Sequence, residues 1–133
     1  MATVGDALQE LKITEWVLRG EPTNEDEFNQ MFRKVTGADS NGSAIETDDT
    51  SKWGVTWKQV SDKQKEMDDA APMNELRRQR NAKLAETDFY ALSDVTMSSD
   101  MAEYREDLRD LPASAKPTLV DGELGNVTWP TKP

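Results

Sequence analysis

The most abundant chemically active side chains in this sequence are carboxylates. Aspartate and glutamate together account for 26 of the 133 residues. Two carboxyl groups at a suitable separation can hydrolyse a glycosidic bond, provided that an apolar setting raises the pKa of one of them. No pair of acidic residues here has clearly apolar neighbours in the sequence. We therefore predict no catalytic residues and no enzymatic activity, and we keep a carboxylate-dependent glycan hydrolase as an alternative function.

The segment Asp39–Ser43 places oxygen-bearing side chains close together, as a calcium-binding loop does. Such a loop also needs glycine at its sixth position and glutamate at its twelfth, where this chain has Ala44 and Thr50. We interpret the segment as a polar turn in which a side chain accepts local backbone hydrogen bonds. A small calcium-stabilised binding module stays as a second alternative, and we predict no metal site and no cofactor.

The chain has one basic patch, which consists of Arg77, Arg78, Arg80 and Lys83. The patch is small, and Glu75 and Glu86 flank it within a chain whose formal net charge is -10. A nucleic-acid-binding surface needs a larger positive field to neutralise phosphates. We expect the patch to pair instead with acidic residues of a later predicted helix. These acids are Glu103, Glu106, Asp107 and Asp110.

The composition excludes several kinds of chemistry. The chain contains no histidine and no cysteine, which excludes a Ser-His-Asp triad, a thiolate nucleophile, a disulfide and a histidine or thiolate zinc site. No apolar run approaches the roughly 20 residues that span a bilayer, so we expect no membrane partner. The first dozen residues lack the basic and apolar regions of a signal peptide, and we expect none.

Two helices are expected near the N-terminus. Thr3 and Asp6 have the spacing of a capping box at the start of a helix over residues 3–11. A second helix is expected to begin at its cap, Thr23, and to end at Gly37. The buried face of this second helix is predicted to be Phe28, Met31, Phe32 and Val35.

Two strands are expected in the same region. Residues 13–18 and 53–57 are rich in β-branched and aromatic side chains, and we predict that they pair. Between them lies a polar loop or a short hairpin about Asn41-Gly42. The three tryptophans of this region are predicted to join its core. They are Trp16, Trp53 and Trp57.

The next region is predicted to be helical. One helix is expected over 58–70 and another over 73–86, with Pro72 either in the first turn of the second helix or at a kink. Thr87-Asp88 is expected to begin a short helical segment. A final helix is expected to start at a serine cap at position 98 or 99 and to run to about Asp110, ended by Pro112. Its apolar face is Met101, Tyr104, Leu108 and Leu111.

These elements predict an α+β fold that is mainly α. A small N-terminal helix and strand region (1–57) precedes a helical hairpin region (58–112) and an extended C-terminal tail (113–133). The tail is polar and rich in proline, and its one apolar cluster ends at Trp129. A single tryptophan in such a tail can anchor it in a partner's pocket, because the ring buries a large area at low entropic cost.

Part of the chain resembles the phage tail assembly chaperone-like family of small phage proteins. The matching motifs, in chain order, are Arg77…Arg80-Asn81, Thr87-Asp88, Leu92-Ser93-Asp94, Tyr104-Arg105, Leu108-Arg109-Asp110-Leu111-Pro112 and Trp129-Pro130. The sequence departs from the family pattern at three places. Phe89 stands where the family usually has tryptophan, Met101 where it often has an aromatic residue, and Lys83-Leu84 where it usually has Leu-Leu.

The resemblance implies a non-enzymatic phage protein that acts through protein–protein contacts in tail, baseplate or tail-fibre assembly or attachment. It implies other phage tail, baseplate or tail-fibre proteins as partners, and the host cytoplasm during assembly, or the virion tail, as the location. A transient chaperone and a permanent structural adaptor both remain open, as does oligomerisation within an assembly. The candidate partner-binding residues are Arg77, Arg80, Asn81, Thr87, Asp88, Tyr104, Arg105, Arg109, Trp129 and Pro130.

Overall fold

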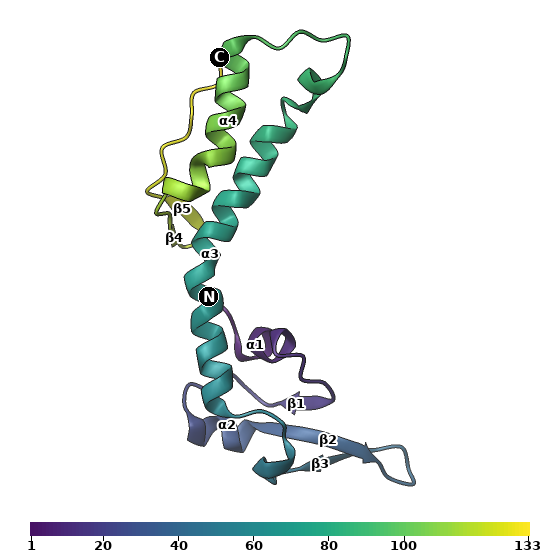
Figure 1. Cartoon of the computed structure of the whole chain (residues 1–133). Helices are drawn as coiled ribbons and strands as arrows, with labels where there is room; N and C mark the ends of the chain where they lie inside the picture. The colour runs from purple at the N-terminus through teal and green to yellow at the C-terminus, as the bar shows by residue number, and fades with distance from the viewer. The chain divides into compact units, whose positions relative to one another are not determined.

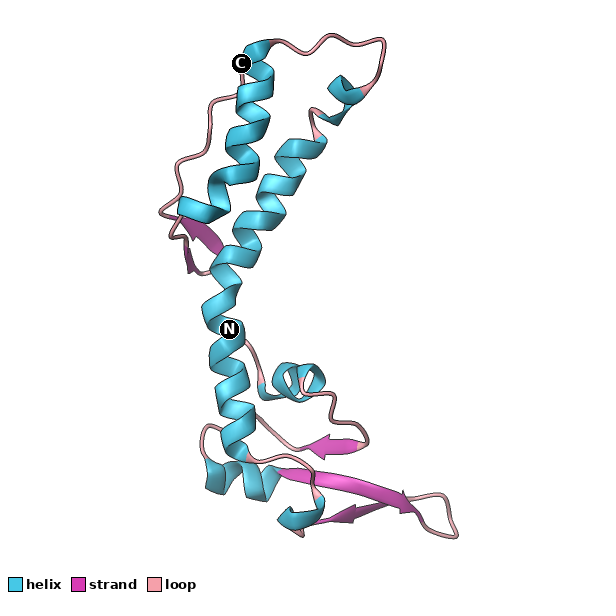
Figure 2. Cartoon of the chain, in the orientation of Figure 1, coloured by secondary structure: helices cyan, strands magenta, loops and turns pink.

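The computed structural model describes all residues from 1 to 133. The fold is α+β and about half helical, with four α-helices and two small antiparallel sheets (Figures 1 and 2). The chain forms two compact units, residues 1–69 (unit 1) and residues 70–133 (unit 2). The long helix α3 (Trp57–Ala85) begins in unit 1 and ends in unit 2. The predicted fold class is confirmed.

The first helix of unit 1 is held by the predicted capping box. Helix α1 (Val4–Glu10) follows Thr3, whose hydroxyl accepts a 3.0 Å hydrogen bond from the Asp6 N–H. The Asp6 carboxylate accepts one of the same length from the Thr3 N–H, so two otherwise unpaired donors of the helix start are satisfied. The buried face of this helix is Val4, Ala7 and Leu8.

The second predicted helix ends earlier than expected. Helix α2 (Glu25–Met31) is capped by Asn24 rather than Thr23, and strand β2 (Phe32–Ala38) follows directly. The predicted helical stripe through Phe32 and Val35 is therefore wrong. Strand β2 is the central strand of its sheet, so its backbone forms hydrogen bonds with a strand on each side. A longer α2 would not form these bonds between strands.

The first sheet has the order β1-β2-β3, all antiparallel. Strand β1 (Trp16–Leu18) lies within the predicted 13–18 strand, and β3 (Ala44–Thr47) forms a hairpin with β2 about Asn41-Gly42. The hairpin alternative is thus confirmed. The predicted strand at 53–57 is wrong, because residues 50–52 form a single 3-10 turn (η1) and Trp57 already belongs to α3.

Aromatic rings fill the core of unit 1. Phe28, Phe32 and Trp53 are buried, with ring centroids 4.9–5.7 Å apart. The indole N–H of Trp53 donates a 2.9 Å hydrogen bond to the Thr47 carbonyl, which gives the buried ring its polar partner. Trp16 and Trp57 pack against this cluster, so the prediction that three tryptophans belong to the N-terminal core is confirmed.

In unit 2, two prolines lie inside helices that they were predicted to end or interrupt. Pro72 lies inside α3, so the helices predicted over 58–70 and 73–86 are one helix. Helix α4 (Ser99–Ser114) begins at the predicted cap, Ser98, but contains Pro112, so the prediction that this proline ends the helix is wrong. A proline removes one helical N–H without forbidding the turn after it, and Ala115 still donates to the Leu111 carbonyl at 3.0 Å.

The region predicted as an extended tail contains a hairpin. Strands β4 (Thr118–Val120) and β5 (Glu123–Gly125) pair antiparallel through Asp121-Gly122, where both residues have positive φ, 51° and 79°. Asp-Gly with positive φ at both positions is the favoured two-residue hairpin turn. Residues 126–133, named here the C-terminal segment, have no regular secondary structure and run back beside α4 (Figure 1).

Candidate partner-binding site

Arg105 joins α4 to the end of α3. Its side chain is only 10% exposed, and its guanidinium donates to the Leu84 carbonyl at 2.9 Å and to the Thr87 hydroxyl at 2.5 Å. The other terminal nitrogen donates to the Asp88 carboxylate at 2.9 Å. The Asp88 side chain is 66% exposed, so the ion pair has one buried and one solvated partner.

The contacts of Arg105 are explained by the unpaired carbonyl groups at the C-terminal end of α3. The last carbonyls of a helix have no partner within the helix and carry its partial negative charge. The forked guanidinium satisfies the Leu84 carbonyl there, and the buried Thr87 hydroxyl donates to the same carbonyl at 3.2 Å. Thr87 directly precedes the 3-10 turn η2 (Asp88–Ala91), so the prediction that Thr87-Asp88 begins a short helical segment is confirmed, although the Thr87 side chain makes no capping hydrogen bond to it.

Tyr104 lies at the centre of the core between the two helices. With Met101 and Leu108 it forms the buried cluster of unit 2, as the predicted helical face requires. Burial raises the pKa of the Tyr104 phenol, and the negative charge of Glu86 raises it further, so the phenol stays neutral. Partly buried residues complete this cluster: Leu84, Tyr90, Met97 and Trp129.

The C-terminal segment packs on the helices of its own unit. Trp129 contacts the Tyr104 cluster, and the Lys83 ammonium lies 4.9 Å from the centroid of its ring. Lys132 lies 3.9 Å from a Glu86 carboxylate oxygen, a long and exposed ion pair. The predicted anchor, Trp129, therefore packs against helices of its own chain in this structure.

The basic patch does not form the predicted ion pairs between helices. Arg78 binds Glu75 on its own helix through two hydrogen bonds of 2.9 and 2.5 Å. These bonds, together with one from the Gln79 side chain, lower the pKa of Glu75 to about 2. Arg80 donates to the Asn81 side chain and, at 3.4 Å, to the backbone carbonyl of Arg109. The expected ion pairs with acids of α4 are absent, because Arg78 is paired one turn away on its own helix and Arg80 reaches α4 only at a backbone carbonyl.

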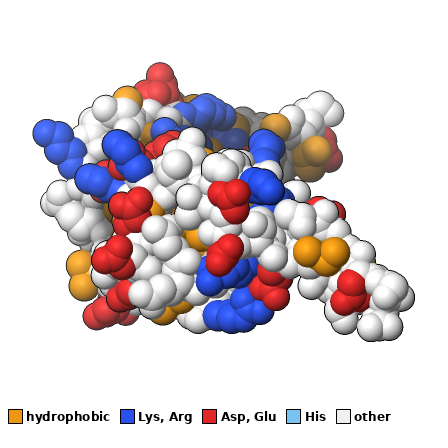
Figure 3. Space-filling model, turned by 90° about the horizontal axis from the view of Figure 1, so that it is seen from below, with side chains coloured by type: hydrophobic (Ala, Val, Ile, Leu, Met, Phe, Trp, Pro, Cys, Tyr) orange, Lys and Arg blue, Asp and Glu red, His pale blue; other side chains and the backbone are white.

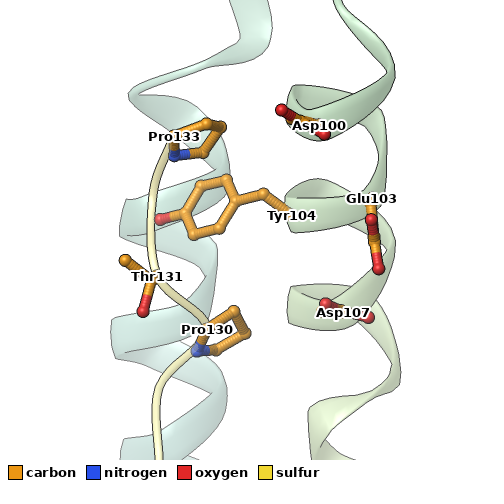
Figure 4. Close-up of a pocket in the computed structure, with 7 residues that line it drawn as sticks. All are labelled: Asp100, Glu103, Tyr104, Asp107, Pro130, Thr131 and Pro133. Carbon is orange, nitrogen blue, oxygen red and sulfur yellow. The ribbon is translucent and has the colours of Figure 1, made fainter.

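An acidic cleft lies between α4 and the C-terminal segment, and the sequence alone did not indicate it. It encloses about 310 Å³. The residues that line this acidic cleft are Asp100, Glu103, Tyr104, Asp107, Pro130, Thr131 and Pro133 (Figure 4). The two walls come from segments more than 20 residues apart, so only folding brings them together. Helical spacing puts the three acids on one face of α4, which was the one available signal.

Three comparisons with known proteins bear on this region. The family model for the phage tail assembly chaperone protein matches residues 73–133. This segment is similar to the phage tail assembly chaperone family. No curated protein and no solved structure matches the chain. The family-matched segment contains the end of α3, all of α4 and the C-terminal segment, and the resemblance inferred from the sequence is confirmed.

The tail assembly chaperone family implies a role in phage tail assembly, and the family is typically non-enzymatic. A glycosidase needs a carboxyl group with a raised pKa. Where the pKa of a carboxyl group is shifted in this chain, hydrogen bonds to the carboxylate lower it. These groups are Asp6, Glu46, Asp49 and Glu75. The shifts run opposite to those of a general acid and lend the hydrolase alternative no support.

The calcium-loop candidate behaves as a polar turn. Asp39 accepts hydrogen bonds from the backbone N–H groups of Asn41 and Ser43, at 2.8 and 3.0 Å. This use of the carboxylate confirms the interpretation of residues 39–43 as a turn stabilised by a local side-chain hydrogen bond. No three acidic side chains in the structure are grouped to hold a metal ion.

Two further surface properties bear on the choice of partner. On the face drawn in Figure 3, basic and acidic side chains are interspersed, without a continuous field of positive charge that would attract a nucleic acid. None of the helices combines the length and the apolar character needed to cross a bilayer.

Proposed function

We propose that the chain serves phage tail assembly as a protein-binding module. In this proposal the α3–α4 hairpin and the C-terminal segment contact another tail, baseplate or tail-fibre protein. The family match of residues 73–133 is the observation that carries the proposal. The site of action is the host cytoplasm during assembly, and the partner is neither a nucleic acid nor a membrane.

The surface of unit 2 divides the candidate residues into two groups. Thr87, Tyr104 and Arg105 are buried, so in this proposal they shape the hairpin and do not meet the partner directly. The remaining candidates reach the surface and are the proposed contacts: Arg77, Arg80, Asn81, Asp88, Arg109, Trp129 and Pro130.

The packing of Trp129 supports a role in binding. The ring is only half-buried at the edge of the Tyr104 cluster. The polar contacts beside it are one cation–π contact and the neighbouring long ion pair. Contacts of this kind are worth about 1 kcal/mol or less each, so a partner pocket that buries the whole ring can outcompete them.

A deletion tests this proposal. A chain lacking residues 127–133 is expected to keep its helical circular dichroism and to lose capture of its phage tail partner. The variant Trp129→Ala should behave like the deletion, and Thr128→Ala, an exposed neighbour, should bind normally. Undiminished capture by the deletion variant would show that the segment is not a contact.

A chaperone and an adaptor differ in whether the protein remains in the mature virion. We propose a transient assembly chaperone, in keeping with the family that residues 73–133 resemble. Quantitative mass spectrometry of purified virions is expected to find it absent or far below the copy number of tail proteins. A stoichiometric amount in the particle would instead establish a structural adaptor.

A further inference from the structure

The C-terminal segment is attached to its own unit by side chains alone. No backbone–backbone hydrogen bond joins residues 126–133 to the rest of the chain. The one hydrogen bond of this segment comes from the Asn126 side chain, which donates to the Lys116 carbonyl at 2.7 Å. Segments with few buried contacts and no backbone pairing open locally at low cost in free energy. The segment can therefore detach while the helices beside it stay folded.

Beyond Asn126, the contacts that hold the segment are few and exposed. Trp129 packs half-buried at the edge of the Tyr104 cluster, with the Lys83 ammonium 4.9 Å from the centroid of its ring. Lys132 lies 3.9 Å from a Glu86 carboxylate oxygen, and these two side chains are 49% and 59% exposed. Lys83 is in the last turn of α3, and Glu86 directly follows that helix. Two neighbouring residues thus supply the polar contacts of the segment.

The covalent connection explains how such weak contacts can still hold the segment. A tethered segment meets its binding surface at an effective concentration on the order of millimolar, so contacts too weak for two separate molecules suffice within one chain. The same weakness leaves a fraction of the molecules with the segment detached. We call the two states closed, with Trp129 packed on its own hairpin, and open, with the segment free.

We propose that the C-terminal segment is a latch that controls access to Trp129. Only the open state offers the whole indole ring to the tail partner, so the apparent affinity of the partner is reduced in proportion to the open fraction. This regulatory role rests on the proposed function, whereas the equilibrium between the open and closed states does not. The latch keeps the apolar anchor covered until a partner binds it.

The latch gives Lys83 and Glu86 an effect opposite in sign to that of a contact residue. Removing a side chain that touches the partner weakens binding. Lys83 and Glu86 instead favour the closed state, so their removal should strengthen the binding of any molecule that takes up Trp129. Neither residue is among the proposed partner contacts, so the two roles can be separated by mutation.

The test uses an antibody fragment as a surrogate partner for the full chain. The probe is a Fab raised against a peptide of residues 126–133 and chosen because the change Trp129→Ala in that peptide abolishes its binding. We expect the native chain to bind this Fab about tenfold more weakly than the free peptide does, since about a tenth of the chains are open. Equal affinity for the native chain and the peptide would overturn the proposal.

A double variant outside the epitope assigns the latch to its contacts. Lys83→Met, Glu86→Gln should bind the Fab about fivefold more tightly than the native chain, because the open fraction rises. The matched control Glu75→Gln, Arg78→Met also removes one positive and one negative charge near the end of α3, from an ion pair that does not contact the segment. This control should bind like the native chain. No tightening in the first variant, or equal tightening in both, would overturn the proposal.

Hydrogen exchange separates opening of the latch from loss of the fold. In Lys83→Met, Glu86→Gln the amides of α4 are expected to keep their native protection, and accelerated exchange throughout α4 would overturn the latch as the cause of tighter binding. If the Fab detects the closed state but no phage tail protein is captured, the assembly role fails and the latch stands. If a tail protein is captured but the Fab binds the chain as tightly as the peptide, the latch alone fails.

Discussion

The guanidinium of Arg105 and the hydroxyl of Thr87 are 2.5 Å apart, and this contact joins α4 to the end of α3. Residues so far apart in sequence meet because the two helices form a hairpin around the Tyr104 cluster. The same guanidinium reaches Leu84 and Asp88, so one side chain satisfies both the helix terminus and the turn that follows.

Arg105→Met should destabilise unit 2. The substitution keeps much of the apolar stem but leaves the buried Thr87 hydroxyl with one fewer partner and removes a charged hydrogen bond at the helix end. We expect the free energy of unfolding to fall by about 2–3 kcal/mol. Chemical denaturation followed by circular dichroism measures this change. Arg109→Met, whose exposed side chain makes no hydrogen bond, is the control and should change stability by less than about 0.5 kcal/mol.

Gly20→Ala should destabilise unit 1 through its backbone conformation. Gly20 has a φ of 137°, and an added Cβ would lie 3.0 Å from the Met31 sulfur. The methionine tip can move, but the strained φ remains, and we expect a loss of about 1–2 kcal/mol. Thermal unfolding is the measurement. The matched change Gly37→Ala, with no neighbour within 4 Å and no positive φ, should cost clearly less; equal losses would contradict this explanation.

The Glu75–Arg78 pair should make stability depend on pH in a defined window. In the folded chain the hydrogen bonds from Arg78 and Gln79 lower the pKa of Glu75 from 4.5 to about 2. The unfolded chain therefore binds the proton more readily, so this contribution is complete above pH 4.5 and is lost as the pH falls toward 2.

Comparison with Glu75→Gln isolates this effect. Denaturation of both proteins at a series of pH values should show the native chain more stable than the variant at neutral pH, with a difference that shrinks below pH 4.5. Because the pair is exposed to solvent, the difference should also decrease with added salt. A difference that grows on acidification would refute the assigned direction.

Lys83→Met should loosen the C-terminal segment without unfolding the hairpin. It removes the ammonium 4.9 Å from the Trp129 ring but keeps an apolar stem of similar length. We expect backbone amides of residues 127–133 to exchange with solvent about threefold faster, while those of α4 are unaffected. Hydrogen exchange followed by NMR reports both regions. Uniform acceleration across α4 would indicate a general loss of stability instead.

Much of the local structure was predictable because its causes are local. The reciprocal hydrogen bonds of Thr3 and Asp6 and the serine cap of α4 depend on residues three positions apart. The hairpin about Asn41-Gly42 follows from the same kind of rule. The β4–β5 hairpin carried an equally local signal in Asp121-Gly122, which the prediction of an extended tail overlooked.

The candidate site was predictable only in part. The resemblance singled out Thr87, Asp88 and Arg105, and the structure brings these three side chains together. It did not indicate that Thr87 and Arg105 would be buried, or that Arg78 would bind Glu75 on its own helix. Burial depends on what packs opposite a residue, which spacing along one chain segment does not specify.

The sequence by itself determined the starts of α1 and α4, the hairpin turn about Asn41-Gly42 and the chemistry that a chain without histidine or cysteine cannot perform. Tertiary structure decided that Phe32–Ala38 is a strand, since pairing on both sides outweighed its helical spacing. It also decided that Trp129 packs beside Lys83 and that the acidic cleft exists. The physical reason is the same in each case: these features depend on contacts between distant segments, which form only when the core assembles.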